Sequence, residues 1–137
     1  MPSVKWLLTP LAAGLLSAAE VHAQVSTPVR FEPAAWYSAL SEEFSTGSIQ
    51  IQVGKTTEGP VVKAVFDDSV KAALPFEAQE EAARTVARYI MAHAAPAPAL
   101  AVIIVGWRGS VEGMPVAQTF RFATVALAEG PTTPKAQ

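Results

Sequence analysis

The run Leu100–Trp107 is apolar on both of the faces that a β-strand presents. Side chains alternate along a strand, so Ile103, Val105 and Trp107 fall on one face. Ile104 falls on the other face, which is apolar as well. Such a strand suits the middle of a sheet, or a sheet that is covered on both sides. The run therefore predicts a fold built around a sheet with this strand in its interior.

Residues 33–44 have the spacing of a short amphipathic helix. Trp36, Leu40 and Phe44 recur every four residues and so share one face. Pro33 suits the first turn of a helix, where the backbone N–H that proline lacks has no partner within the helix. The sequence predicts a helix over 33–44.

Residues 76–93 form a second, longer helical pattern. Apolar side chains recur at intervals of four residues, and charged side chains fill the opposite side. Glu80 precedes Arg84 by four residues, and acidic residues precede basic ones along the segment, which matches the helix dipole. Because Pro96 and Pro98 cannot continue it, we predict a helix over 76–93.

Three further runs have strand character. Residues 48–53 alternate between polar and apolar, which indicates a strand with one buried face. Residues 61–66 are rich in β-branched and apolar side chains, and turn residues at 54–60 join the two runs into an antiparallel hairpin. Residues 116–125 form the last predicted strand, which a loop at 109–115 connects to the central one.

The predicted order is helix, strand, strand, helix, strand, strand. The simplest packing of this αββαββ order is a small α+β two-layer sandwich, in which both helices cover one face of a four-stranded, mainly antiparallel sheet. This single domain spans 32–128 and follows an N-terminal linker at 24–31. Pro131 and Pro134 fall in the last segment, 129–137, which we predict to be a disordered tail.

Residues 1–23 have the layout of a secretory signal peptide, with a basic start, an apolar run and small residues before the expected cut. The apolar run is shorter than the ~20 residues that cross a bilayer, and Pro10 interrupts it. A buried N-terminal helix is the competing interpretation, but no capping residue precedes the run. We expect cleavage before Gln24, with a cut before Glu20 as the alternative. The mature protein would be secreted or periplasmic, without a stable membrane anchor.

Composition excludes several function classes. The chain has no cysteine, which excludes disulfides, thiolate metal sites and a cysteine nucleophile. It has 10 Lys and Arg against 12 Asp and Glu, for a net charge of −2, and its basic residues are not clustered. A nucleic-acid partner is therefore not expected. No cofactor or metal site is indicated either.

The titratable residues favour structural roles. His93 is the one histidine outside the predicted signal peptide, and it ends the second predicted helix, where its ring can contact the last carbonyls. Adjacent acids occur at 42–43, 67–68 and 80–81 and suit solvated faces or strand exits. A small hydrolase that uses His93 or an acidic pair is the alternative hypothesis.

Covering one face of the sheet with both helices leaves the other face for a partner. The candidate interaction surface is the set Ile103, Val105 and Trp107. Arg108 and Arg121 would then lie across the Trp107 ring as a cation–π contact. Burial of the apolar set in the core is the competing interpretation.

These observations favour an exported, non-catalytic binding or accessory protein of the cell envelope or exterior over an enzyme. The expected partner is an envelope protein or a small apolar ligand on the uncovered sheet face. That face would also serve a homodimer, because an exposed apolar patch marks a contact site.

Overall fold

The computed structural model describes residues 27–44 and 47–129. The predicted signal peptide and both of its cleavage sites lie outside these residues, as does the predicted tail beyond Glu129. No helix in the described part of the chain is long and apolar enough to cross a membrane.

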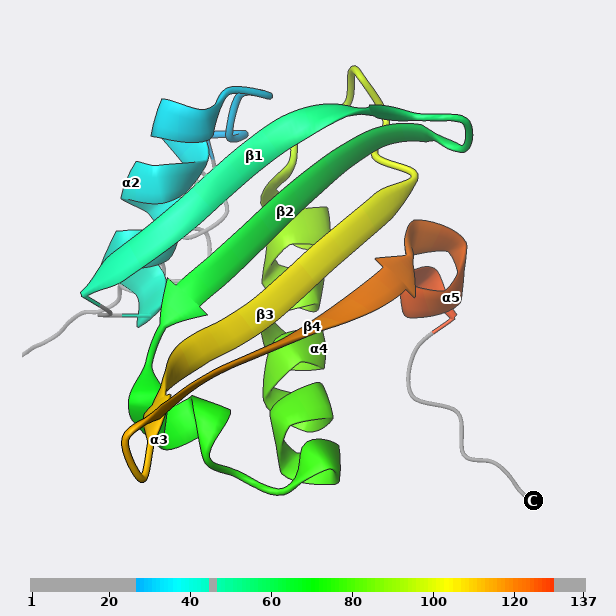
Figure 1. The fold of residues 1–137 in the computed structure, drawn as a ribbon. Helices are drawn as coiled ribbons and strands as arrows, with labels where there is room; N and C mark the ends of the chain where they lie inside the picture. The colour runs from blue at the N-terminus through cyan, green and yellow to red at the C-terminus, as the bar shows by residue number, and fades with distance from the viewer. Residues whose placement is uncertain (1–26, 45–46, 130–137) are drawn as a thin grey trace, which may run out of the picture.

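Four strands form one sheet in the order β1-β2-β3-β4 (Figure 1). They are β1 (Ser48–Thr56), β2 (Gly59–Asp67), β3 (Val102–Val111) and β4 (Met114–Ala123). The strand predicted from the doubly apolar run is β3, and it lies in the interior of the sheet as expected. Both outer pairs are antiparallel, whereas the central pair β2–β3 is parallel. The fold is the predicted α+β sandwich, with a mixed sheet.

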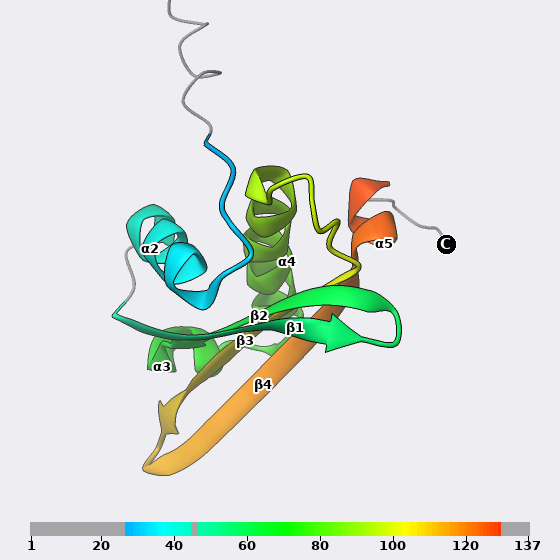
Figure 2. The ribbon, with the colours of Figure 1, turned by 90° about the horizontal axis from the view of Figure 1, so that it is seen from above.

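The two long helices have the predicted bounds. They are α2 (Pro33–Phe44) and α4 (Phe76–His93), and both lie on the same side of the sheet (Figure 2). Two short helices were not predicted: α3 (Ser69–Ala72) and α5 (Thr124–Ala128). The last strand therefore ends at Ala123, and the expectation that it reaches residue 125 is wrong.

The parallel pairing of β2 and β3 follows from the connection between them. After β2 the chain passes through α3 and α4 before it enters β3. Parallel strands need such a long crossover, because the chain must return to the end from which it started. The antiparallel pairs have tight turns instead.

Both hairpins are tighter than the loops predicted at 54–60 and 109–115. The first strand continues to Thr56 and the second starts at Gly59. In the second hairpin, Glu112 and Gly113 both have positive φ, at 53° and 80°. Two successive residues of positive φ are the signature of a type I′ turn, whose twist matches that of the flanking strands.

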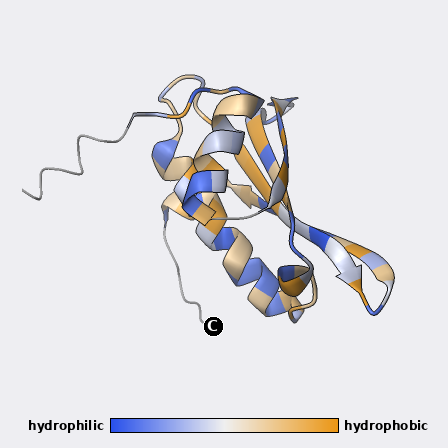
Figure 3. Cartoon of the chain, turned by 90° about the vertical axis from the view of Figure 1, so that its left-hand side faces the viewer, coloured by the Kyte–Doolittle hydropathy of each residue, from blue (hydrophilic) through white to orange (hydrophobic). Residues whose placement is uncertain are grey.

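The core lies between the sheet and the helices α2 and α4. Alternate side chains of all four strands point into it. The hydropathy colours of Figure 3 show α4 as mixed along its length. Seven aromatic side chains are part of this core, since each is buried in it or packed against it: Trp36, Phe44, Phe66, Tyr89, Trp107, Phe120 and Phe122.

Part of the predicted linker at 24–31 is attached to the domain. The N–H of Val29 donates to the carbonyl of His93 at 2.8 Å, and the N–H of Ala95 donates to the carbonyl of Val29 at 3.2 Å. Val29 and Phe31 also pack against the core. This segment therefore ties the chain that precedes α2 to the end of α4.

Candidate functional site

The apolar part of the predicted interaction surface is buried. Ile103 and Val105 are 0% exposed and Trp107 is 3% exposed, and all three belong to the core between sheet and helices. They therefore cannot form an open surface, and the competing interpretation of core burial is correct. The physical reason is that the helices cover this face of β3, and not the face that carries Ile104.

The two arginines of that predicted surface also have other partners. Arg108 bonds to the carboxylate of Asp67, and Arg121 pairs with Glu58. The hydrogen bond from Arg108 is the largest cause that lowers the pKa of Asp67 below its usual value. Neither arginine lies across the Trp107 ring. The prediction that Arg108 and Arg121 make a cation–π contact with this ring is therefore wrong.

His93 has the local role predicted for the end of the helix. Its Nδ1 lies 2.9 Å from the carbonyl oxygen of Tyr89, one turn earlier. Its ring stacks on the ring of Tyr89, with centroids 4.0 Å apart. Within 27–44 and 47–129, no hydrogen bond joins His93 to a hydroxyl or a carboxylate. The arrangement is that of a helix end.

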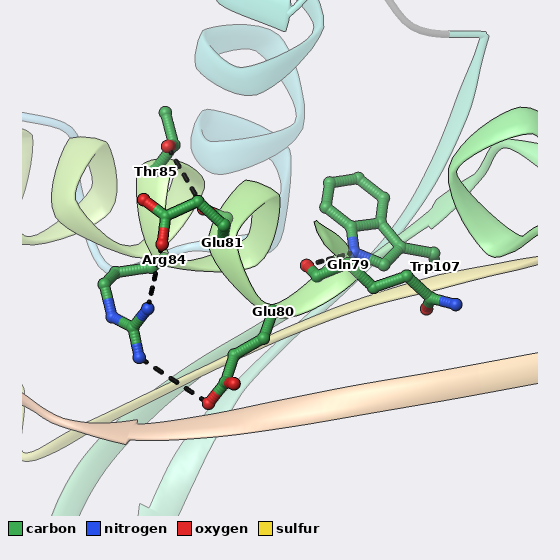
Figure 4. A network of polar contacts seen from close by, with 6 residues as sticks. All are labelled: Gln79, Glu80, Glu81, Arg84, Thr85 and Trp107. Carbon is green, nitrogen blue, oxygen red and sulfur yellow. Dashed lines mark hydrogen bonds and ion pairs between the residues drawn. The ribbon is translucent and has the colours of Figure 1, made fainter. Parts of the chain in front are cut away.

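The adjacent acids at 67–68 and 80–81 are likewise engaged in local contacts. Glu80 and Glu81 both pair with Arg84, at 3.5 and 3.2 Å (Figure 4). Asp67 bonds to Arg108, whereas Asp68 caps α3. The described residues contain no group of three His, Cys, Asp or Glu side chains placed to hold a metal ion.

A cavity of about 260 Å³ lies between α4, α3 and the end of α2, at the carboxyl end of the parallel ladder. Three aromatic rings, two small aliphatic side chains and three polar side chains line the cavity: Phe44, Phe66, Trp107, Ala82, Val86, Asp68, Lys71 and Thr85.

The parallel pairing brings two of the rings together. Phe66 and Trp107 are register partners in β2 and β3, and their ring centroids are 5.1 Å apart. Phe44, the last residue of α2, meets the edge of Phe66 at a centroid distance of 6.2 Å. The three rings come from three separate elements and form one apolar wall.

A buried hydrogen bond fixes the indole in this wall. The Nε1–H of Trp107 donates to the backbone carbonyl of Gln79 at 3.1 Å (Figure 4). The side-chain amide of Gln79 donates in turn to the carbonyls of Ala72 and Leu74, at 3.1 and 2.8 Å. Gln79 therefore attaches both the indole and the α3–α4 connection to the start of α4, which holds α3 beside the cavity.

The mouth of the cavity carries one carboxylate and one ammonium. Asp68 is the N-cap of α3, and its carboxylate accepts the backbone N–H of Lys71 at 3.0 Å. The Nζ of Lys71 lies 3.8 Å from Asp68 Oδ2 and 5.4 Å from the centroid of the Trp107 ring. The cation over Trp107 is thus Lys71, which sequence reasoning did not single out.

Comparisons with known proteins identify no relative: no family model, curated protein or solved structure matches the chain. The cavity is therefore interpreted from its own residues. One sequence signal beside it existed, because aspartate is among the residues preferred at helix N-caps. Asp68 could have indicated the short helix α3, but not the rings that meet beside it.

Proposed function

We propose that this protein is an exported, non-catalytic binding protein whose cavity holds a small, mainly apolar molecule. The observation that carries the proposal is the wall of three aromatic rings around a cavity of about 260 Å³. An apolar cavity of about 150 Å³ can hold benzene, so this one has room for a substituted single ring. The expected ligand site is this cavity, and not the open sheet face.

Two further features support binding over catalysis. Concave sites lined by apolar and aromatic side chains, with a few polar groups to orient the ligand, are typical of small-molecule sites. Of the residues that a hydrolase would use, His93 makes a helix-end contact and Asp68 caps a helix. Asp67, Glu80 and Glu81 form ion pairs with arginines.

The experiment is a titration with tert-butylbenzene, a neutral single-ring probe, followed through the NMR signal of the Trp107 indole N–H. We expect saturable binding with a Kd on the order of 0.1–1 mM, since the probe has few atoms with which to gain affinity. Ala82→Leu fills the cavity and should weaken binding at least about tenfold, because the bulkier side chain occupies the ligand volume.

Ala92→Leu is the matched control, because Ala92 is an exposed residue of the same helix that does not line the cavity. It should leave the affinity unchanged. Absence of binding, or binding that Ala82→Leu does not weaken, would contradict the proposed function.

Export is the second part of the proposal and has its own test. The basic start, apolar run and small residues of 1–23 predict that the exported protein begins at Gln24. N-terminal sequencing of protein recovered from the periplasm or the medium should find this end, or the alternative end at Glu20. An exported protein that still begins at Met1 would contradict the predicted signal peptide.

A further inference from the structure

A positive charge already lies at the aromatic wall of the cavity. The ammonium of Lys71 is 5.4 Å from the centroid of the Trp107 ring, within the ~6 Å at which a cation is attracted to the face of an indole. One face of this ring is therefore turned toward Lys71, which lines the same cavity. The same ring is anchored from the core side by its bond to Gln79, so it is a rigid platform.

Lys71 holds this position only weakly. Its side chain is 41% exposed, and its 3.8 Å separation from Asp68 is at the long end for an ion pair. Exposed ion pairs of this kind contribute about 0–1 kcal/mol. Lys71 can therefore turn toward solvent at little cost and leave the ring face to another cation.

The carboxylate of Asp68 remains in place when Lys71 turns away. Its side chain is 28% exposed, and the backbone N–H at the start of α3 fixes it. A carboxylate therefore stays beside the ring face, where it can pair with another cation.

From this arrangement we infer that the ligand of the cavity is a small organic cation of the alkylated ammonium class, which replaces Lys71 beside Asp68 and the Trp107 ring. The inference rests on the proposed function and names the chemistry of its ligand. An alkylated ammonium spreads its charge over methyl groups, so it loses little hydration when it enters a site made of ring faces. An anion would instead meet the carboxylate of Asp68.

The test compares two probes of the same shape that differ in charge. Phenyltrimethylammonium and tert-butylbenzene are titrated against the purified protein, with the indole N–H of Trp107 as the reporter. We expect the cation to bind about tenfold more tightly than the neutral probe, as a desolvated cation–π contact with a carboxylate nearby would give. Benzoate, the anionic probe, should bind more weakly than either.

Two variants assign the effect to the residues at the mouth. Asp68→Asn should weaken binding of the cation about tenfold and leave the neutral probe within about twofold, because asparagine caps a helix as well as aspartate does. Lys71→Met should strengthen binding of the cation about threefold or more, because it removes the competing ammonium. The neutral probe again serves as the control for an intact cavity.

The outcomes separate this inference from the proposed function. Equal affinities for the two probes, or tighter binding of benzoate, would overturn the inference while the proposed binding function stands. Cation binding that Lys71→Met weakens would overturn it as well, since the lysine would then assist the ligand. Failure of both probes to bind would overturn the inference together with the proposed function.

Discussion

Replacing Trp107 with alanine should lower the free energy of unfolding by about 3–5 kcal/mol. The indole is 3% exposed, packs on Phe66 and donates its N–H to Gln79. Removing it leaves a void at the point where β2, β3 and α4 meet, and the residues around a void relax only partly. Chemical denaturation followed by circular dichroism measures the change.

Two variants calibrate this prediction. Trp107→Phe keeps a ring in the core and loses the hydrogen bond to Gln79, so we expect a smaller loss of about 1–2 kcal/mol. Tyr37→Ala removes an aromatic side chain that is 42% exposed on α2, and should cost about 1 kcal/mol or less. If Trp107→Ala costs no more than Tyr37→Ala, the indole does not have the packing described above.

The long helices were predictable because their signals are local. Pro33 begins α2, and Trp36, Leu40 and Phe44 show the face that it buries. The bounds of α4 also have local signals. The helical spacing of apolar residues begins after Pro75, and prolines follow His93. A pattern that repeats over three or more turns identifies an element without knowledge of its neighbours.

Strand direction and turn length were harder to predict, because they depend on partners. The alternation in 48–53 and the apolar run that begins at Leu100 indicate strands, but neither shows which strand lies beside which. The parallel β2–β3 pair has one signal, the long helical connection between the strands. The sequence predicts a loop at 109–115. The tight turn at Glu112-Gly113 has little local signal, because glutamate rarely adopts the positive φ that it has there.

The cavity was not predictable from the sequence. The sequence places Phe44 on the apolar face of a helix and leaves Trp107 between an interaction surface and the core. Nothing local shows that these two rings and the ring of Phe66 border a space beside Lys71. Gln79 bonds to the carbonyls of Ala72 and Leu74 and so keeps α3 beside the space, which is a property of the assembled fold. Likewise, alternation divides the side chains of β3 into two faces but does not say which face the helices cover.

The substitutions Ile103→Ala and Ile104→Ala test which face of β3 the helices cover. Ile103 is 0% exposed and contacts the core beside Val62, whereas Ile104 lies half-buried on the opposite face, with Lys63 and Arg121 as its register partners. Ile103→Ala should cost about 2–5 kcal/mol, as for a fully buried isoleucine. Ile104→Ala should cost about 1 kcal/mol or less in the monomer, because solvent and long polar side chains border it.

The test measures denaturation midpoints of both variants and of the unchanged protein at two widely separated protein concentrations. The two changes remove the same atoms from adjacent positions of one strand, so any difference between them arises from the two faces. Equal costs would contradict the assignment of the covered face. A midpoint that rises with concentration would mean that a second copy covers the open face, because association stabilises only the folded form. Ile104→Ala should then reduce that rise, while Ile103→Ala lowers the midpoint equally at both concentrations.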